Sequence, residues 1–191
     1  MAQLTPLLAS RWSPRAFDPT AVITDTELAS LLEAARWAPS FANGQPWRFL
    51  IGRRGDEAYE RILANLSETH QRWAGRAAML LLGAHTATGP NGAPLTHAAY
   101  DLGQAIAHLT VQATALRLHV RQVADFDAAG LHNDLDLPAG VRPHVVAAVG
   151  LVGDPLSLPE DLHRRETGLR QRRPVTDLLL RDLPLRDLPR Y

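Results

Sequence analysis

Apolar and polar residues alternate along this chain in patterns that predict both helices and strands. A first, short helical pattern runs from Leu4 to Ser10. The segment Thr24–Glu27 reads Thr-Asp-Thr-Glu, a capping box in which the first and last side chains each bond to a backbone amide of the other. Apolar residues follow with helical spacing, at Leu28, Leu31, Leu32 and Ala35. We therefore expect a core helix that begins after Thr24 and ends at Pro39.

In the next two segments the spacing of the apolar residues differs. Trp47, Phe49 and Ile51 alternate with Arg48 and Leu50, which predicts a strand with one well-buried face. From Gly55 to Trp73 the helical spacing returns, and we expect one second helix over this whole range. Its apolar side is formed by Tyr59, Ile62, Leu63 and Leu66.

The middle of the chain holds its most apolar strand and its longest helix. Ala77–Ala84 reads AAMLLLGA, a continuous apolar run that suits a central strand covered on both faces. His85–Pro94 is rich in Gly, Pro, Asn and Thr and is expected to be a loop. Thr96–Leu118 has a long helical pattern with many alanines, and a core helix within one subunit is its simplest interpretation. Its spaced apolar residues are Leu102, Ile106, Leu109, Ala113 and Leu116.

Shorter patterns fill the C-terminal third. A β-like run precedes Arg121, and Val145–Val152 is the last clear strand, starting after Pro143. Pro159–Thr167 is a short polar helix or loop. Beyond it, the sequence L-R-D-L-P occurs twice, which favours an extended arm over a repeat domain. We predict one domain over residues 1–175 and a C-terminal arm over residues 176–191.

Composition narrows the class of partner. The 191 residues suit a single domain, and the formal net charge of zero gives no reason to expect nucleic acid or an anionic membrane as a partner. A small-molecule substrate fits better. Cysteine is absent, which excludes disulfides, thiolate nucleophiles and thiolate metal sites. No apolar run reaches the length of a signal peptide core or a bilayer span, so we expect a cytoplasmic protein.

The loop between the first core helix and the first strand is the best candidate site. Ser40, Asn43 and Gln45 supply a hydroxyl and two side-chain amides suited to hydrogen-bond the edge of a heteroaromatic ring. An ordinary turn has the same composition, and the residues alone favour that interpretation. Other chemistry has little support: HExxH, GxSxG, P-loop and GxGxxG motifs are absent, and Asp134 with Asp136 is more typical of solvated carboxylates, so we expect no metal site.

Two motifs together carry a resemblance to a known family. Arg11–Asp18 reads RWSPRAFD, and Ala38–Phe49 contains A-P-S-x-x-N-x-Q-P-W-x-F. In their order and spacing they resemble the nitroreductase family of FMN-dependent oxidoreductases. The resemblance extends from Arg11 to Pro174. It implies an α+β fold with a central, mostly antiparallel sheet of about four or five strands, flanked by helices, in an intertwined homodimer whose interface centres on the long helix.

The resemblance also implies how FMN is held. Arg11, Ser13 and Arg15 would bind its phosphate together with Arg170 and Arg172, through charge-assisted hydrogen bonds. The Pro39–Gln45 loop would reach the flavin ring from the partner subunit, and the segment near Asp125 would pass beside the reactive nitrogen. The complete set of expected cofactor-binding residues is Arg11, Trp12, Ser13, Arg15, Pro39, Ser40, Phe41, Asn43, Gln45, His70, Val123, Ala124, Asp125, Arg170 and Arg172.

At two of these positions the chain departs from the family pattern. His70 stands where Asn is usual, in a segment that resembles the family's N-Q-x-W. Either the imidazole donates one hydrogen bond to the flavin edge or the contact is lost. Asp125 stands where Gly is usual. If the backbone there needs a positive φ, Asp is one of the few residues that tolerate it.

The activity implied by the resemblance is a two-electron, ping-pong reduction. NADH or NADPH would reduce FMN, and the flavin would then reduce a nitroaromatic, a quinone or a similar small acceptor. The flavin carries this chemistry, so no side chain is assigned as catalytic. Trp37 and Phe41 are hypothesised to wall the acceptor pocket. Two alternatives stay open: a non-enzymatic FMN-binding protein, and a family member specialised for dehalogenation or oxidative ring chemistry.

Overall fold

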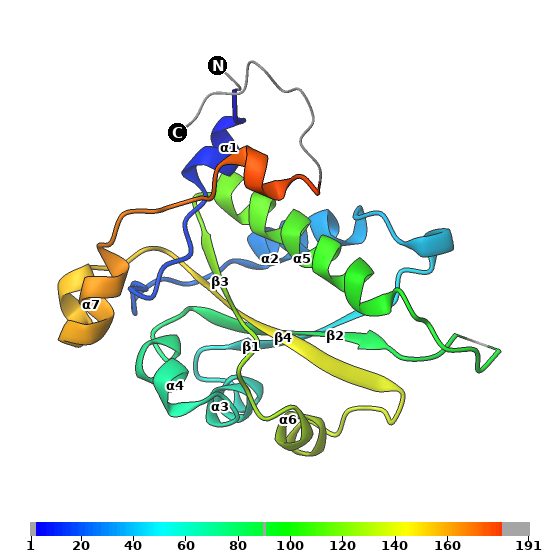
Figure 1. Ribbon diagram of the computed structural model, residues 1–191. Coiled ribbons are helices and arrows are strands. Elements are labelled where there is room, and N and C mark those ends of the chain that lie inside the picture. The colour runs from blue at the N-terminus through cyan, green and yellow to red at the C-terminus, as the bar shows by residue number, and fades with distance from the viewer. Residues whose placement is uncertain (1–2, 90, 181–191) are drawn as a thin grey trace.

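A four-stranded sheet forms the centre of the computed structural model, which describes residues 3–89 and 91–180 (Figure 1). The strands are β1 (Trp47–Arg53), β2 (Met79–Thr86), β3 (His119–Val123) and β4 (Val141–Gly150). They lie in the order β1-β2-β4-β3, and each neighbouring pair is antiparallel. The predicted α+β class with an antiparallel sheet is therefore confirmed.

Helices cover both faces of this sheet (Figure 1). On one face lie α1 (Pro6–Ser10), α2 (Asp25–Arg36) and the long α5 (Ala98–Ala115). On the other lie α3 (Glu57–Ala64), α4 (Glu68–Ala74) and α6 (Ala128–Asp134), with α7 (Glu160–Glu166) beside them. Three short 3₁₀ turns complete the described elements: η1 (Phe41–Asn43), η2 (Pro155–Ser157) and η3 (Val175–Leu178).

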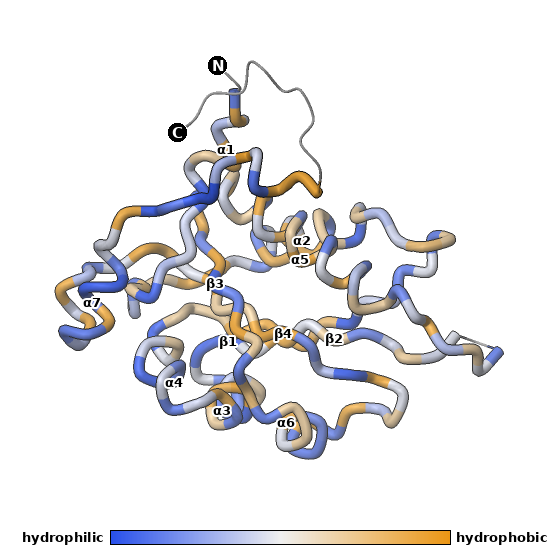
Figure 2. The backbone as a smooth tube through the Cα atoms, viewed as in Figure 1, coloured by the Kyte–Doolittle hydropathy of each residue, from blue (hydrophilic) through white to orange (hydrophobic). Residues whose placement is uncertain are grey.

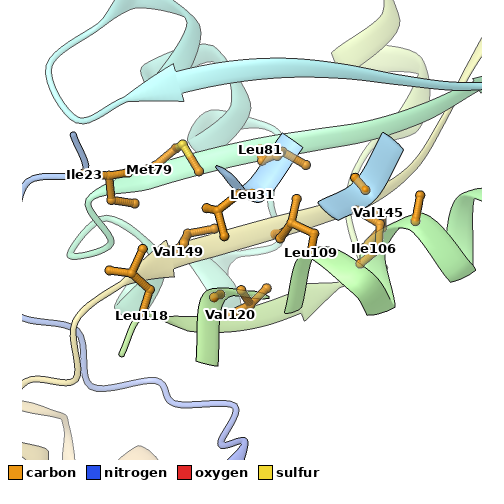
Figure 3. Close-up of a cluster of buried hydrophobic side chains, with 14 of the residues drawn as sticks. Ile23, Leu31, Met79, Leu81, Ile106, Leu109, Leu118, Val120, Val145 and Val149 are labelled. Carbon is orange, nitrogen blue, oxygen red and sulfur yellow. The ribbon is translucent and has the colours of Figure 1, made fainter. Parts of the chain in front are cut away.

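Two hydrophobic clusters, one on each face, hold the layers together. Alternate residues of β2 point to opposite sides: Met79 and Leu81 join the cluster under α2 and α5, and Leu80 and Leu82 join the other. Figure 3 shows the first cluster, and Figure 2 shows the apolar colour gathered along the middle of the sheet. The prediction of a central strand covered on both faces is confirmed.

The two main helices on the first face also match their predicted patterns. The capping box is present at Thr24, whose hydroxyl accepts from the Glu27 amide at 3.2 Å while the Glu27 carboxylate accepts from the Thr24 amide at 2.8 Å. In α5, four of the predicted apolar positions are buried and Leu116 packs against them. Of the helices in residues 3–89 and 91–180, none combines the length and hydrophobicity needed to cross a bilayer.

The prediction of one helix from Gly55 to Trp73 is wrong. The helix is interrupted between Ala64 and Glu68, which separates α3 from α4. Leu66 forms a β-bridge with Phe126, and Ser67 has extended backbone angles of φ −60° and ψ 151°. Burying Leu66 against a segment distant in sequence has therefore overridden the local helical pattern.

The predicted bounds of the last strand are also wrong. β4 begins at Val141, before Pro143, and ends at Gly150. Pro143 is tolerated inside the strand because it lies opposite Ala84, where the register with β2 shifts and the ladder is already interrupted. α6 was not predicted. The loop was predicted to start at His85, which is too early, because β2 continues to Thr86.

The predicted C-terminal arm is described only at its start. Residues 176–178 lie in η3, and residues 181–191 lie outside the described residues. The boundary at residue 175 stays a prediction.

Candidate functional site

The N-terminal motif, Arg11–Asp18, lies beside the C-terminal segment that contains Arg170. After α1 the chain runs in extended form, and it is anchored by Ala16 and Phe17, both fully buried. The Arg170 guanidinium donates to the carbonyls of Arg11 at 2.8 Å and Ala9 at 2.9 Å, and it lies 5.7 Å from the centre of the Trp12 ring. Three of the expected phosphate and flavin residues are thus neighbours in one chain, although they are far apart in sequence.

Arg172 is placed differently. Its side chain is exposed and donates to the neighbouring Gln171 carbonyl at 2.7 Å. Within the described residues it makes no hydrogen bond to the N-terminal motif. Its predicted role at the phosphate therefore has no support from the geometry of one chain.

A buried carboxylate on α7 forms hydrogen bonds to the N-terminal motif. Glu166 is only 6% exposed and accepts hydrogen bonds from the Trp12 indole at 3.1 Å and the Arg15 amide at 2.8 Å. The Arg15 guanidinium lies 3.9 Å from the same carboxylate. Arg15 therefore already has a charge partner within the chain, whereas the Arg11 guanidinium has no hydrogen bond among the described residues.

Arg121, on β3, also contacts the N-terminal motif. Its guanidinium donates to the Ser13 carbonyl at 2.8 Å and lies over the Trp73 ring, 5.1 Å from its centre. Burial, together with the neighbouring charge of Arg15, lowers the pKa of Arg121 to about 10. Its Nε is buried with no hydrogen-bond partner in the described structure. The guanidinium groups of Arg15 and Arg121 thus lie close to each other at the N-terminal motif.

The two residues that depart from the family pattern face each other. His70 on α4 and Asp125, just after β3, place their Nε2 and Oδ2 atoms 4.0 Å apart. Burial lowers the pKa of His70, and the Asp125 carboxylate acts in the opposite direction. The His70 Nδ1 is buried without a partner in the described structure. Asp125 does not have a positive φ, so its backbone here does not require glycine.

Next to Arg11 and Ser13, α5 and β3 enclose a hollow of about 310 Å³. Arg11 and Ser13 line one side of it, and the Gln122 amide, which donates to the Thr110 hydroxyl at 3.3 Å, lies on another. Val123 is the buried end of β3, and Ala124 after it is exposed. The N-terminal motif, β3 and the C-terminal end of α5 therefore surround a common space.

The polar loop Pro39–Gln45 lies at the other end of α5. The buried Asp101 carboxylate accepts from the Phe41 amide at 3.1 Å, and the Gln104 side chain donates to the Pro39 carbonyl at 3.4 Å. Thr110, which lines the hollow, follows Asp101 by nine residues, or about 13 Å along the helix. One chain therefore brings the N-terminal motif, His70 and Asp125 together, but it does not bring the loop to them.

Four residues of this region were missed by sequence reasoning. Asp101, Gln104, Arg121 and Glu166 occupy ordinary helix or strand positions, and their roles arise from contacts with segments 60 to more than 150 residues away. Only Arg121 gave a signal, as the charged residue that directly follows a short β-like run.

Comparisons with known proteins agree with this arrangement. A profile of the Nitroreductase family matches residues 8–69. A crystal structure described as an oxidoreductase containing FMN is 32% identical, with a TM-score of 0.88 over 94% of this chain and 91% of that one. An uncharacterized 15.4 kDa protein from Mycolicibacterium smegmatis is 34% identical over 132 residues, 65% of this chain and 88% of that protein. The major NAD(P)H-flavin oxidoreductase of Aliivibrio fischeri is 34% identical over 64 residues, 34% of this chain and 29% of that protein.

The matched profile region contains both motifs that first suggested the family, Arg11–Asp18 and the loop that precedes β1. The likeness to the FMN-containing oxidoreductase extends over 94% of this chain. Sequence and fold therefore lead to the same assignment: this chain belongs to the nitroreductase family.

Proposed function

We propose that this chain is an FMN-dependent oxidoreductase that uses NADH or NADPH to reduce a small acceptor such as a nitroaromatic or a quinone. The proposal draws support from two similar proteins, one described as containing FMN and one named an NAD(P)H-flavin oxidoreductase. When bound, FMN would supply the two-electron redox chemistry. The chain's own residues would bind, orient and shield it.

The observation that carries the proposal is a pair of unsatisfied buried atoms. His70 Nδ1 and Arg121 Nε are buried without a hydrogen-bond partner among the described residues. Buried polar atoms in folded proteins are nearly always paired, so these two favour a partner that the chain itself does not supply. A flavin offers hydrogen-bonding groups along its ring edge and ribityl chain, and the site therefore fits this cofactor.

The charges of the N-terminal motif and of Arg170 suit the phosphate end of the same cofactor. Arg11 lines the hollow, and Arg170 lies against the same segment. Each charged hydrogen bond to a phosphate stabilises binding by roughly 1.5–3 kcal/mol. Loss of one arginine should therefore weaken FMN binding by about tenfold or more, since 1.4 kcal/mol is a factor of ten.

We further propose a homodimer in which each flavin site uses both subunits. The loop Pro39–Gln45 carries the polar groups expected at the ring, yet it lies about 13 Å along α5 from the hollow near Arg11. A partner chain that packs along α5 in the opposite direction would bring its loop toward that hollow. The exposed Trp37 and Phe41 side chains, 72% and 66% accessible, would be covered in such a pair.

Visible absorption of the purified, dialysed protein is the first test. Stoichiometric yellow chromophore that chromatography identifies as FMN, together with NADH or NADPH oxidation in the presence of a quinone, is the expected result. Arg11→Ala should then raise the FMN Kd about tenfold or more. Arg164→Ala, an exposed arginine of α7 paired with Glu160, is the matched control and should leave the Kd unchanged. A colourless protein that takes up no added FMN would refute the proposed function.

A further inference from the structure

The loop Pro39–Gln45 has a backbone conformation that its residues do not favour. Ala42, Asn43 and Gln45 all have positive φ values, of 49°, 55° and 44°. Asn tolerates this left-handed region, but Ala and Gln carry a β-carbon that crowds the following carbonyl and have no short side chain to compensate. Three such residues within four positions make this the most strongly strained segment among the described residues.

Burial of apolar side chains does not explain the strained backbone of this loop. Phe41, Ala42 and Asn43 are exposed, and none of them belongs to either hydrophobic cluster. A backbone in a rarely populated region persists only where its surroundings hold it there, and such segments concentrate at functional sites. What holds this loop therefore indicates how it works.

Groups on α5 hold the loop at its first half. The Asp101 carboxylate, only 4% exposed, accepts from the Phe41 amide, the residue directly before the first strained position. Gln104, one turn further on, donates to the Pro39 carbonyl, and the His97 ring lies 4.6 Å from the Phe41 ring. Burying a carboxylate costs desolvation free energy unless it is hydrogen-bonded. The hydrogen bond from the Phe41 amide in the loop offsets part of that cost for Asp101.

We propose that Asp101 is a positioning residue that keeps the Pro39–Gln45 loop in its strained shape, and that flavin binding depends on the loop being held in this shape beforehand. This inference rests on the proposed function. A loop that is already ordered loses little conformational entropy when it binds a ligand, so relaxing it should weaken binding even where no contact is removed.

Ala42→Gly separates this idea from a merely structural role. Glycine adopts a positive φ without cost, so the thermal midpoint should rise by roughly 2 °C. The relaxed loop must then be ordered during binding, and the FMN Kd should rise at least about threefold. Stability and affinity are thus expected to move in opposite directions.

Asp136→Gly is the matched control. Asp136 also has a positive φ, 47°, and it is exposed in the segment between α6 and β4, outside the candidate site. Because Asp tolerates a positive φ better than Ala does, its replacement should stabilise the fold less than Ala42→Gly, and it should leave the FMN Kd unchanged. If Ala42→Gly binds FMN as tightly as the wild type, the proposed dependence on a strained loop is overturned.

Asp101 is tested with two variants and a readout that needs no flavin. In Asp101→Ala the Phe41 amide loses its acceptor, so its hydrogen exchange, followed by NMR on the apoprotein, should accelerate at least tenfold, and the FMN Kd should rise about tenfold. Asp101→Asn keeps an acceptor oxygen and should restore most of both values. Unchanged Phe41 exchange in folded Asp101→Ala would overturn the positioning role.

The outcomes also distinguish this inference from the proposed function. If the wild type binds no FMN, the proposed function fails and the flavin part of the inference fails with it, while Phe41 exchange still decides whether Asp101 holds the loop. If the wild type binds FMN and the Asp101→Ala and Ala42→Gly variants bind it equally well, only the inference is overturned.

Discussion

Glu166 is expected to be a main support of the N-terminal motif, although it lies near the opposite end of the chain. Its carboxylate accepts from the Trp12 indole and the Arg15 amide and faces the Arg15 guanidinium. Glu166→Ala removes a buried acceptor that serves both donors. Hydrogen bonds to a charged group contribute roughly 1.5–3 kcal/mol each, and breaking a buried charge pair costs about 3–5 kcal/mol.

We therefore expect Glu166→Ala to lower the free energy of unfolding by about 3–5 kcal/mol. Glu166→Gln keeps one acceptor oxygen of nearly the same shape and should cost only about 1–2 kcal/mol. In a chain of this size each kcal/mol corresponds to about 2–4 °C in the thermal midpoint, so the alanine variant should melt at least about 6 °C lower. Urea unfolding, followed by Trp fluorescence, measures the same difference directly.

Glu160→Ala is the control on the same helix. Glu160 pairs with Arg164, and both side chains are more than 70% exposed, so its loss should change the free energy of unfolding by less than about 0.5 kcal/mol. If Glu166→Ala were as stable as Glu160→Ala, the contacts of Glu166 would contribute little, and the reasoning that it anchors Trp12 and Arg15 would be refuted.

Three further predictions concern other parts of the chain. Burial lowers the pKa of His70 and His119 in the folded protein, so the unfolded chain binds more protons. The free energy of unfolding should therefore fall as the pH drops below about 6.5. Equal urea midpoints at about pH 7.5 and 5.5 would contradict this. Gly52→Ala should destabilise by at least about 2 kcal/mol, because the new Cβ would lie 2.5 Å from Tyr59 backbone atoms; a urea midpoint near that of the wild type would disprove the close approach. Phe41→Ala should raise the KM for aromatic acceptors by roughly 2–10-fold in steady-state assays, and unchanged KM values for every accepted substrate would remove Phe41 from the acceptor pocket.

Local patterns in the sequence were sufficient to predict most of the fold. Each of these patterns is formed by residues close together in the chain: the capping box at Thr24, the helical spacing along α5 and the apolar run of β2. The break between α3 and α4 could not be predicted this way, because it depends on the bridge between Leu66 and Phe126, 60 residues apart. The predicted start of the last strand, after Pro143, was wrong for a related reason. A register shift in β2 allows Pro143 to lie within β4, and the sequence around Pro143 does not reveal that shift.

The candidate site was predictable only in part. Motifs gave the N-terminal arginines, the loop and His70, because these groups stand in recognisable short segments. Arg121, Glu166 and Asp101 act through single long-range hydrogen bonds, and an isolated charged residue in a helix or strand has no local pattern that identifies such a contact. Arg172 shows the opposite case, a motif position whose side chain contacts its own neighbour.

The position of α5 between the two parts of the candidate site has a consequence for evolution. Asp101 holds the loop at one end of this helix, and Thr110 faces the hollow near the other. Inserting one residue between them would rotate one end relative to the other by about 100° and move it by about 1.5 Å, which would disturb both contacts at once. The exposed residues 91–94 before the helix carry no such constraint. Relatives should therefore differ in length there and keep a constant number of residues between the positions of Asp101 and Thr110.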